Sequence, residues 1–325
     1  MLKKLYSIST ICLLLISCLS FISASSEIIQ TSSGTTWYVD DDGPADFTSI
    51  QDAIDASSDG DTVYVYNGTY NENIVINKAN LTLQGEDNEN TVINATIEED
   101  TIIINADYVS LQGFKLINSG SDHTIFVKNN NCKIKGNIIY GNSLICLLNT
   151  LNNIIDGNIL YGSVSLLNSD NNIVTSNILY EAAAIYIQFA SSNNEITKNI
   201  IDQEVPSVGI MLGDFTNPDV KNNIISYNTI KNCKHGIDVY FSENTISYND
   251  FLNNKINANV YFRGHCLWYH NYWGASNRFP FEWKTHIPRL VYGKILSATP
   301  SGSTIFLDLD LFPARTPNCD FGGET

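Results

Sequence analysis

An alternation of apolar and polar positions recurs along the middle of the chain, each time around an asparagine. A large apolar residue stands three positions before each of these asparagines, as Ile134 does, and another stands two positions after, as Ile139 does. The intervals between successive asparagines in the numbering are 21, 19, 22, 29, 21 and 22. The seven are Asn137, Asn158, Asn177, Asn199, Asn228, Asn249 and Asn271. Such a recurrence predicts an architecture in which each repeat stacks on the next.

The offsets also predict the path of one repeat. Upstream pairs such as Ile237 and Val239 alternate with period two, which is the pattern of a strand with one buried face. The chain is then expected to turn at the asparagine, which tolerates the left-handed backbone of a tight corner, and to continue as a second short strand. Stacked asparagine side chains can hydrogen-bond along the axis as a ladder.

We therefore expect an all-β fold, a single-stranded right-handed parallel β-helix (solenoid), because connections between parallel strands are almost always right-handed. A short helix is expected to cap its N-terminal end. Residues 37–39 and 62–66 are predicted strands, and between them Thr48 or Ser49 can cap a helix whose apolar stripe begins at Ile50. Such a helix would cover the core and strand edges that the first coil otherwise exposes.

The segment 1–24 has the pattern of a signal peptide. Lys3 and Lys4 precede a short apolar stretch, and small residues follow, so cleavage is expected after Ala24. Two alternatives stay open: an uncleaved anchor, and a lipid anchor at Cys18, whose surroundings resemble a lipobox. Neither nucleic acid nor a membrane span after signal cleavage is expected.

The remaining chain divides into the β-helix, residues 37–274, and an irregular C-terminal cap or tail, residues 275–325, where prolines interrupt short apolar runs. The longest interval, from Asn199 to Asn228, predicts an insertion, with Val205–Asp219 as the protruding segment. Cys132 and Cys266 share a column of the repeat but lie six coils apart. At the spacing of neighbouring strands that is about 29 Å, too far for a disulfide.

The amino-acid composition excludes some classes of binding partner. The chain has 325 residues, of which 43% are apolar and 16% charged, with a net charge of −16. A strongly acidic chain is unsuited to bind nucleic acid or an anionic membrane surface, since both interactions depend on Lys and Arg. Asparagine is unusually common and occupies about one position in eight. Three asparagines, Asn67, Asn80 and Asn94, stand in N-x-Thr sequons.

The segment from Asp46-Phe47-Thr48 to Leu83-Gln84-Gly85 resembles the opening of many pectin lyase-like superfamily proteins. The later repeats, which close in Asn271-Tyr272-Trp273-Gly274, resemble NosD-type right-handed β-helix proteins of bacterial and archaeal surfaces and periplasms. The resemblance covers about residues 37–274. It implies the fold and an exported location, whereas activity must be argued from a site.

An enzyme of this superfamily would need particular catalytic residues. Gly68-x-Tyr70-x-Glu72 matches one short motif of pectin methylesterases, but the other catalytic motifs of that family are absent from the sequence. A calcium-dependent lyase would need several converging oxygen ligands, and a hydrolase would need paired carboxylates. The acidic residues of the repeats fall in different columns, so the sequence predicts no resident metal and no cofactor, with Ca²⁺ only under the lyase alternative. Specific copper handling, which a NosD resemblance suggests, lacks the Met, Cys and His clusters that copper prefers.

The richest local cluster holds His235 and Asp238, with Arg263 about one coil further on, as low-grade catalytic candidates. Lys234 and His265 lie next to them in the sequence. The aromatic residues of the C-terminal coils include three candidate binding residues, Tyr240, Tyr261 and Trp268. Aromatic faces can stack on sugar rings, and large residues can equally fill the last coils.

These observations favour an exported cell-surface or periplasmic protein, extracellular or in the envelope, that binds a polysaccharide or an envelope component without transforming it. The alternative is a divergent polysaccharide lyase or glycoside hydrolase of the pectin lyase-like superfamily, with its site around Asp238 and Arg263. A purely structural role in a surface layer is the third interpretation.

Overall fold

The computed structural model describes residues 34–96, 99–118, 120, 123–141, 143–214, 219–240, 243–261, 266–274, 289–295, 304–310, 313–314 and 316–319. The predicted signal peptide, Cys18, Arg263 and His265 lie outside these residues. Among the helices of the described part, none is long and apolar enough to cross a membrane.

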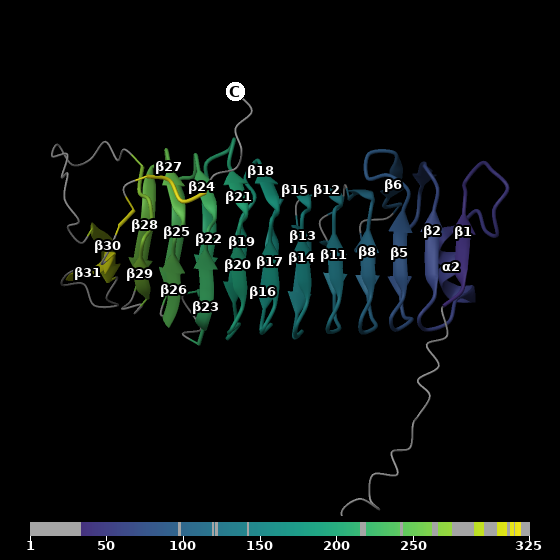
Figure 1. Ribbon diagram of the computed structural model, residues 1–325, viewed down its shortest axis with the longest axis horizontal. Coiled ribbons are helices and arrows are strands. Elements are labelled where there is room, and N and C mark those ends of the chain that lie inside the picture. Colours follow the sequence, from purple (N-terminus) through teal and green to yellow (C-terminus); the bar gives the residue numbers. More distant parts are fainter. Residues whose placement is uncertain are drawn as a thin grey trace, which may run out of the picture. The chain divides into compact units, whose positions relative to one another are not determined.

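The described chain from residue 34 onward is a right-handed parallel β-solenoid of about ten turns, as the repeat predicts. Its strands form three ladders, one on each side of the coil, and Figure 1 shows them following one another in chain order from β1 to β29. Each coil visits ladder 1, then ladder 3, then ladder 2. Neighbouring coils pair in parallel, so one core runs through the whole stack.

Ladder 1 consists of β1 (Thr36–Val39), β2 (Thr62–Val65), β5 (Thr82–Gly85), β8 (Ser110–Gln112), β11 (Lys133–Lys135), β14 (Ile154–Asp156), β17 (Ile173–Thr175), β20 (Glu195–Thr197), β23 (Lys221–Ser226), β26 (Glu243–Ser247), β29 (Leu267–Tyr269) and β31 (Thr304–Asp310). Ladder 2 consists of β4 (Ile74–Ile76), β7 (Ile102–Ile104), β10 (His123–Val127), β13 (Ser143–Leu148), β16 (Val164–Leu167), β19 (Ile185–Gln188), β22 (Val208–Leu212), β25 (His235–Tyr240), β28 (Ile256–Tyr261) and β30 (Arg289–Ile295). Ladder 3 consists of β3 (Gly68–Tyr70), β6 (Thr91–Asn94), β9 (Lys115–Ile117), β12 (Ile138–Tyr140), β15 (Ile159–Tyr161), β18 (Ile178–Tyr180), β21 (Ile200–Asp202), β24 (Thr229–Lys231) and β27 (Asp250–Leu252).

The predicted capping helix is α2 (Ile50–Ala56), and Ser49 is its N-cap. Ile50 and Ile54 are fully buried against the first coil. The carboxylate of Glu72 accepts hydrogen bonds from the backbone N–H groups of Ile50 and Gln51, each at 2.9 Å, and from the hydroxyl of Ser49 at 3.1 Å. Glu72 therefore satisfies donors at the start of the helix that have no partner within it.

This contact gives the Gly68-x-Tyr70-x-Glu72 motif a structural role. Tyr70 is buried and donates its hydroxyl to the carbonyl of Tyr66 at 2.9 Å, which fixes the turn before the motif. Both polar side chains of the motif thus hold the first coil and the helix together.

The predicted asparagine ladder is continuous in the structure. In each neighbouring pair the side-chain Nδ2 of one asparagine donates to Oδ1 of the next, at 2.9 to 3.1 Å, from Asn137 to Asn271. The same Oδ1 also accepts the backbone N–H of the preceding ladder asparagine, as Asn177 does for Asn158 at 2.9 Å. All seven side chains are buried. The ladder therefore satisfies a column of polar groups inside the corner between ladders 1 and 3.

The expected left-handed conformation of the ladder asparagines is wrong. The left-handed residue is the one before each of them, with φ between 56° and 64°. These residues are Gly136, Gly157, Ser176, Lys198, Tyr227, Tyr248 and His270. The ladder asparagine turns its side chain inward to hydrogen-bond, and its neighbour reverses the chain direction. Two adjacent residues thus build the corner together.

A second column of asparagines, which the sequence analysis missed, lines the corner between ladders 2 and 1. Its members are Asn153, Asn172, Asn194, Asn223 and Asn244, each five positions before a ladder asparagine. Asn172, for example, donates from Nδ2 to Oδ1 of Asn194 at 3.1 Å. Four of the five follow another asparagine with positive φ, such as Asn171 at 57°. Paired asparagines at this corner account for part of the asparagine content.

The structure also describes parts of two further segments named in the sequence analysis. The expected protrusion Val205–Asp219 contains β22, so its centre is part of ladder 2. Within the expected irregular segment 275–325, β30 and β31 pair with each other in antiparallel fashion and extend ladders 2 and 1. Residues 318 and 319 return to the last coils, where their backbone N–H groups donate to the carboxylate of Asp250 at 2.7 and 3.0 Å.

Candidate functional site

The predicted residues His235 and Asp238 lie on one strand of ladder 2, β25. Strand alternation sends Ile237 and Val239 into the core, where both are fully buried, and so directs Asp238 and Tyr240 to the outer side. The register places Asp238 beside Asn259 and Tyr240 beside Tyr261 on β28. The site is therefore formed by residues of two neighbouring coils, which the parallel register brings side by side.

The carboxylate of Asp238 is the unusual group of this site. Its Oδ2 lies 3.0 Å from Nδ1 of His235, whose side chain is 20% exposed. Only 8% of the Asp238 side chain is exposed, and within the described residues its Oδ1 has no hydrogen-bond partner. Burial raises the pKa of this carboxyl, and the neighbouring His235 and Asn259 offset only part of that shift. Asp238 therefore carries a buried acceptor whose desolvation is not offset by a hydrogen bond within the described residues.

Two stacked tyrosines border the carboxylate. The rings of Tyr240 and Tyr261 lie 4.4 Å apart between centroids and 5° from parallel, and Asn259 Nδ2 donates a hydrogen bond to the Tyr261 hydroxyl. Burial and, to a smaller extent, the nearby Asp238 raise the pKa of both phenols above the ordinary 10. Because the facing sides of the rings cover each other, a sugar cannot stack between them. Any contact with a ligand would therefore involve the ring edges that carry the hydroxyls.

The structure separates the other predicted site residues from this cluster. Trp268 is fully buried and packs near Trp273, with 5.9 Å between ring centroids, so its prediction as a surface binding residue is wrong. It fills the core of a late coil, because the residue three positions before a ladder asparagine always faces inward. Arg263 lies outside the described residues, and its role stays a prediction.

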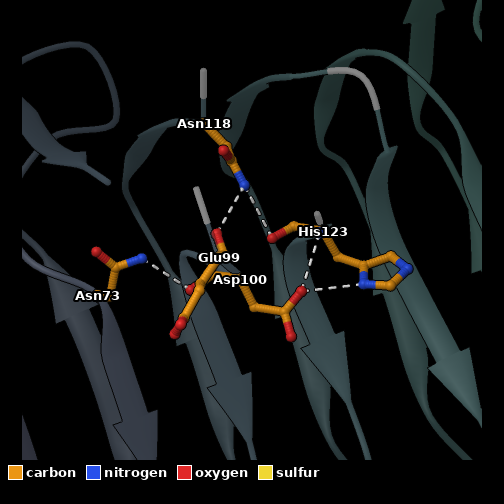
Figure 2. A network of polar contacts seen from close by, with 5 residues as sticks. All are labelled: Asn73, Glu99, Asp100, Asn118 and His123. Atoms are coloured by element: carbon orange, nitrogen blue, oxygen red, sulfur yellow. Dashed lines mark hydrogen bonds and ion pairs between the residues drawn. The ribbon is translucent and has the colours of Figure 1, made fainter. Parts of the chain in front are cut away.

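A second histidine–aspartate pair lies on the same ladder and was missed in the sequence. Nδ1 of His123, the first residue of β10, lies 3.0 Å from Oδ1 of Asp100. Figure 2 marks this contact with a dashed line. The same oxygen accepts the backbone N–H of His123 at 2.9 Å. The side chains of Asn73 and Asn118 donate to the Asp100 and Glu99 carbonyls, at 3.0 and 3.3 Å, so three successive coils are connected (Figure 2).

The repeat length could have revealed this pair in the sequence, because Asp100 and His123 stand about one coil apart in the numbering. His123 stacks on Phe126, with 5.0 Å between centroids, and Lys128 Nζ lies 4.7 Å from the Phe126 centroid. Asp100 contacts both the backbone and the ring of His123, which is typical of a residue that stabilises the contact between neighbouring coils. Among the two pairs, the one at Asp238 keeps the unsatisfied acceptor.

Aromatic stacking also runs along the outer side of ladder 3. Tyr140 and Tyr161 stack at 4.4 Å, and Tyr161 and Tyr180 at 5.5 Å. Here too the ring faces point along the solenoid axis. Such rows stabilise the stacking of coils and do not provide a flat aromatic platform for a sugar.

Comparisons with known proteins bear on the fold and leave the activity open. No family model matches the chain. A cell surface glycoprotein of Methanothermus fervidus is 41% identical over 97 residues, which are 29% of this chain and only 16% of that protein. The A-module of the Azotobacter vinelandii mannuronan C-5 epimerase AlgE6 is similar in structure, with a TM-score of 0.51 and 15% identity over 68% of this chain and 71% of that one.

An alginate lyase from Paenibacillus sp. str. FPU-7 is also similar, with a TM-score of 0.47 and 12% identity over 70% of this chain and 96% of that one. At such identities the likeness is one of fold alone. The NosD-type resemblance stays a prediction.

Proposed function

We propose that this protein is exported and binds a polysaccharide or another hydroxyl-rich envelope component on the outer side of ladder 2, without transforming it. The observation that carries this proposal is the buried Oδ1 of Asp238, which lacks a hydrogen-bond partner within the described residues. A buried acceptor left unsatisfied costs about 1–3 kcal/mol. A sugar hydroxyl that reaches Oδ1 would remove that cost, and His235, Tyr240 and Tyr261 on the same two strands would offer further polar groups.

A cell-surface location fits this proposal. The predicted signal peptide would direct export, either with cleavage after Ala24 or with a lipid anchor at Cys18. The partial relative from Methanothermus fervidus is named a cell surface glycoprotein. A rigid solenoid whose coils are fixed by buried asparagine ladders offers a long surface that changes little on binding, which limits the entropy lost in the complex.

The second candidate is a polysaccharide lyase or hydrolase at the same residues. It is favoured by the contact between His235 and the Asp238 carboxyl, whose pKa burial raises, because a carboxyl and an imidazole in contact can exchange protons with a substrate. Under this alternative the site includes Asp238 and Arg263, and a lyase would require Ca²⁺.

One experiment separates the two candidates. The mature protein is passed over immobilised acidic and neutral polysaccharides, with and without calcium, while soluble samples are followed for new reducing ends and for unsaturated-uronate absorbance. Binding without product, lost in Asp238→Ala, supports the proposed function. Turnover that Asp238→Ala abolishes would establish the enzyme instead. The matched control is Asp156→Ala, on the outer side of ladder 1, which should retain binding.

A further inference from the structure

The sequons are confined to the first coils. Although asparagine is common along the whole chain, only Asn67, Asn80 and Asn94 stand in an N-x-Ser/Thr context. The fold explains why the ladder asparagines do not stand in such a context. The residue two positions after each ladder asparagine faces the core, as the fully buried Ile139 does after Asn137, so a hydroxyl residue is disfavoured there. The acceptor motif is therefore expected where the chain leaves that pattern.

The three sequons differ in their surroundings. Asn67 lies in the turn between β2 and β3, and Asn80 lies between β4 and β5 with a φ of 57°; both are exposed. Asn67 accepts a hydrogen bond on Oδ1 from the Thr91 hydroxyl at 3.1 Å. Within the described residues, no hydrogen bond is made by Nδ2 of Asn67 or of Asn80. Asn94 is half-buried at the end of β6, and its Nδ2 donates to Oδ1 of Asn71 at 2.9 Å.

We propose that Asn67 and Asn80 are acceptor sites for N-linked glycans. In the transfer, Nδ2 forms a bond to the anomeric carbon of a lipid-phosphate-linked sugar and loses one proton to a base of the transferase. The bond between that carbon and the phosphate oxygen breaks, and its electron pair leaves with the lipid phosphate. Exposed turns whose amide nitrogen is not engaged meet the requirement of this reaction, whereas the hydrogen-bonded Asn94 does not.

The placement of these sites is compatible with the proposed ligand surface. Asn67 lies at the corner between ladders 1 and 3, and Asn80 at the corner between ladders 2 and 1. Neither lies on the outer side of ladder 2. From β4 to β25 there are seven steps along ladder 2, about 34 Å at the usual strand spacing. Glycans would thus cover the N-terminal coils and leave the surroundings of Asp238 open.

The test is the mass of the secreted protein. The full chain is expressed in a host that performs N-glycosylation, together with a known glycoprotein as a positive control, and its intact mass and proteolytic peptides are measured. We expect a mass above that of the polypeptide by two glycans, located on the peptides that contain Asn67 and Asn80. Thr82→Ala should remove the glycan at Asn80, and Thr82→Ser, which keeps the sequon, should retain it.

Thr62→Ala is the matched control, because Thr62 pairs with Thr82 on the neighbouring strand of ladder 1 and is not in a sequon. It should leave both glycans in place. Circular dichroism verifies that each variant is folded. Unmodified peptides at Asn67 and Asn80, while the control glycoprotein is modified, would overturn the proposal, as would modification at Asn94 alone. Because the readout is mass, its outcome is independent of ligand binding.

Discussion

Asn177 Oδ1 accepts two hydrogen bonds from Asn158, one from its backbone N–H at 2.9 Å and one from its side-chain Nδ2 at 3.0 Å. Both residues are completely buried. One side chain therefore satisfies two donors of the coil before it, and its own Nδ2 donates to Oδ1 of Asn199 at 3.0 Å in the coil after it. Each inner member of the ladder therefore couples three coils.

Asn177→Ala should destabilise the protein by about 3 kcal/mol, because it leaves several buried polar groups without partners at about 1–3 kcal/mol each. Urea unfolding followed by circular dichroism measures the change. Asn90→Ala is the control, since Asn90 is exposed and outside both columns, and it should stay within about 0.5 kcal/mol. Equal effects of the two substitutions would contradict a stabilising ladder.

The corner conformation leads to a different prediction at Gly157. This residue has a φ of 64°, and a Cβ placed on it would meet nothing within 4 Å. A substitution there acts through backbone strain and not through steric clash. Gly157→Val should destabilise the protein by about 1–2 kcal/mol, the usual penalty for a left-handed residue with a side chain. Gly157→Asn should have a clearly smaller effect in the same unfolding assay, and a reversed order would refute the assignment.

The contact of Glu72 with the capping helix predicts a role in stability. Glu72→Ala removes the acceptor for two backbone N–H groups and the Ser49 hydroxyl, so we expect a loss of about 2 kcal/mol and earlier melting of the N-terminal coils. Hydrogen exchange at Ile50 and Gln51 would report the local opening. Glu89→Ala, at an exposed glutamate, is the control. Unchanged protection in Glu72→Ala would show that the helix does not depend on this carboxylate.

The repeat could be predicted from the sequence because the same positions are buried in every coil and must therefore be apolar. Positions such as Ile134 and Ile139 face the core, and a polar replacement at either would bury an unsatisfied group. The ladder asparagine between them is fixed by the same requirement. Residues under such constraints carry a signal that one sequence is enough to show.

The left-handed residue before the ladder asparagine carries no such signal. Gly136, Ser176, Lys198 and Tyr227 all occupy this position with similar φ values. Several residue types thus tolerate the strain of this conformation, and the sequence does not reveal where the chain reverses.

The candidate site was predictable only in part. His235 and Asp238 are close neighbours along one strand, and a local cluster is visible in sequence. The contact between Asp100 and His123 spans one coil, so it appears only once the register is known. For Trp268 the sequence held the right information, but the prediction did not use it. Its aromatic character suggested binding, whereas its place three positions before Asn271 already marks it as a core position.

Asp238 also links the proposed binding site to stability. Its pKa is raised above the ordinary 3.8 mainly by burial, so the folded protein holds this proton more tightly than the unfolded chain. As the pH rises from about 4 through the folded-state pKa, the unfolded chain loses the proton first, and stability falls across that window. Above it, the ionised carboxylate stays a net destabilising group.

Asp238→Asn, which is nearly the same size and carries no charge, should therefore raise the melting temperature at pH 7, and the difference from the natural protein should disappear below about pH 4. Asp156→Asn, on the outer side of β14, serves as the control and should change stability by no more than about 0.5 kcal/mol at pH 7. Thermal melts at about pH 3.5, 5 and 7 provide the comparison. A lower melting temperature for Asp238→Asn at pH 7 would mean that the contact with His235 outweighs burial, and that the carboxylate is held for stability and not for a ligand.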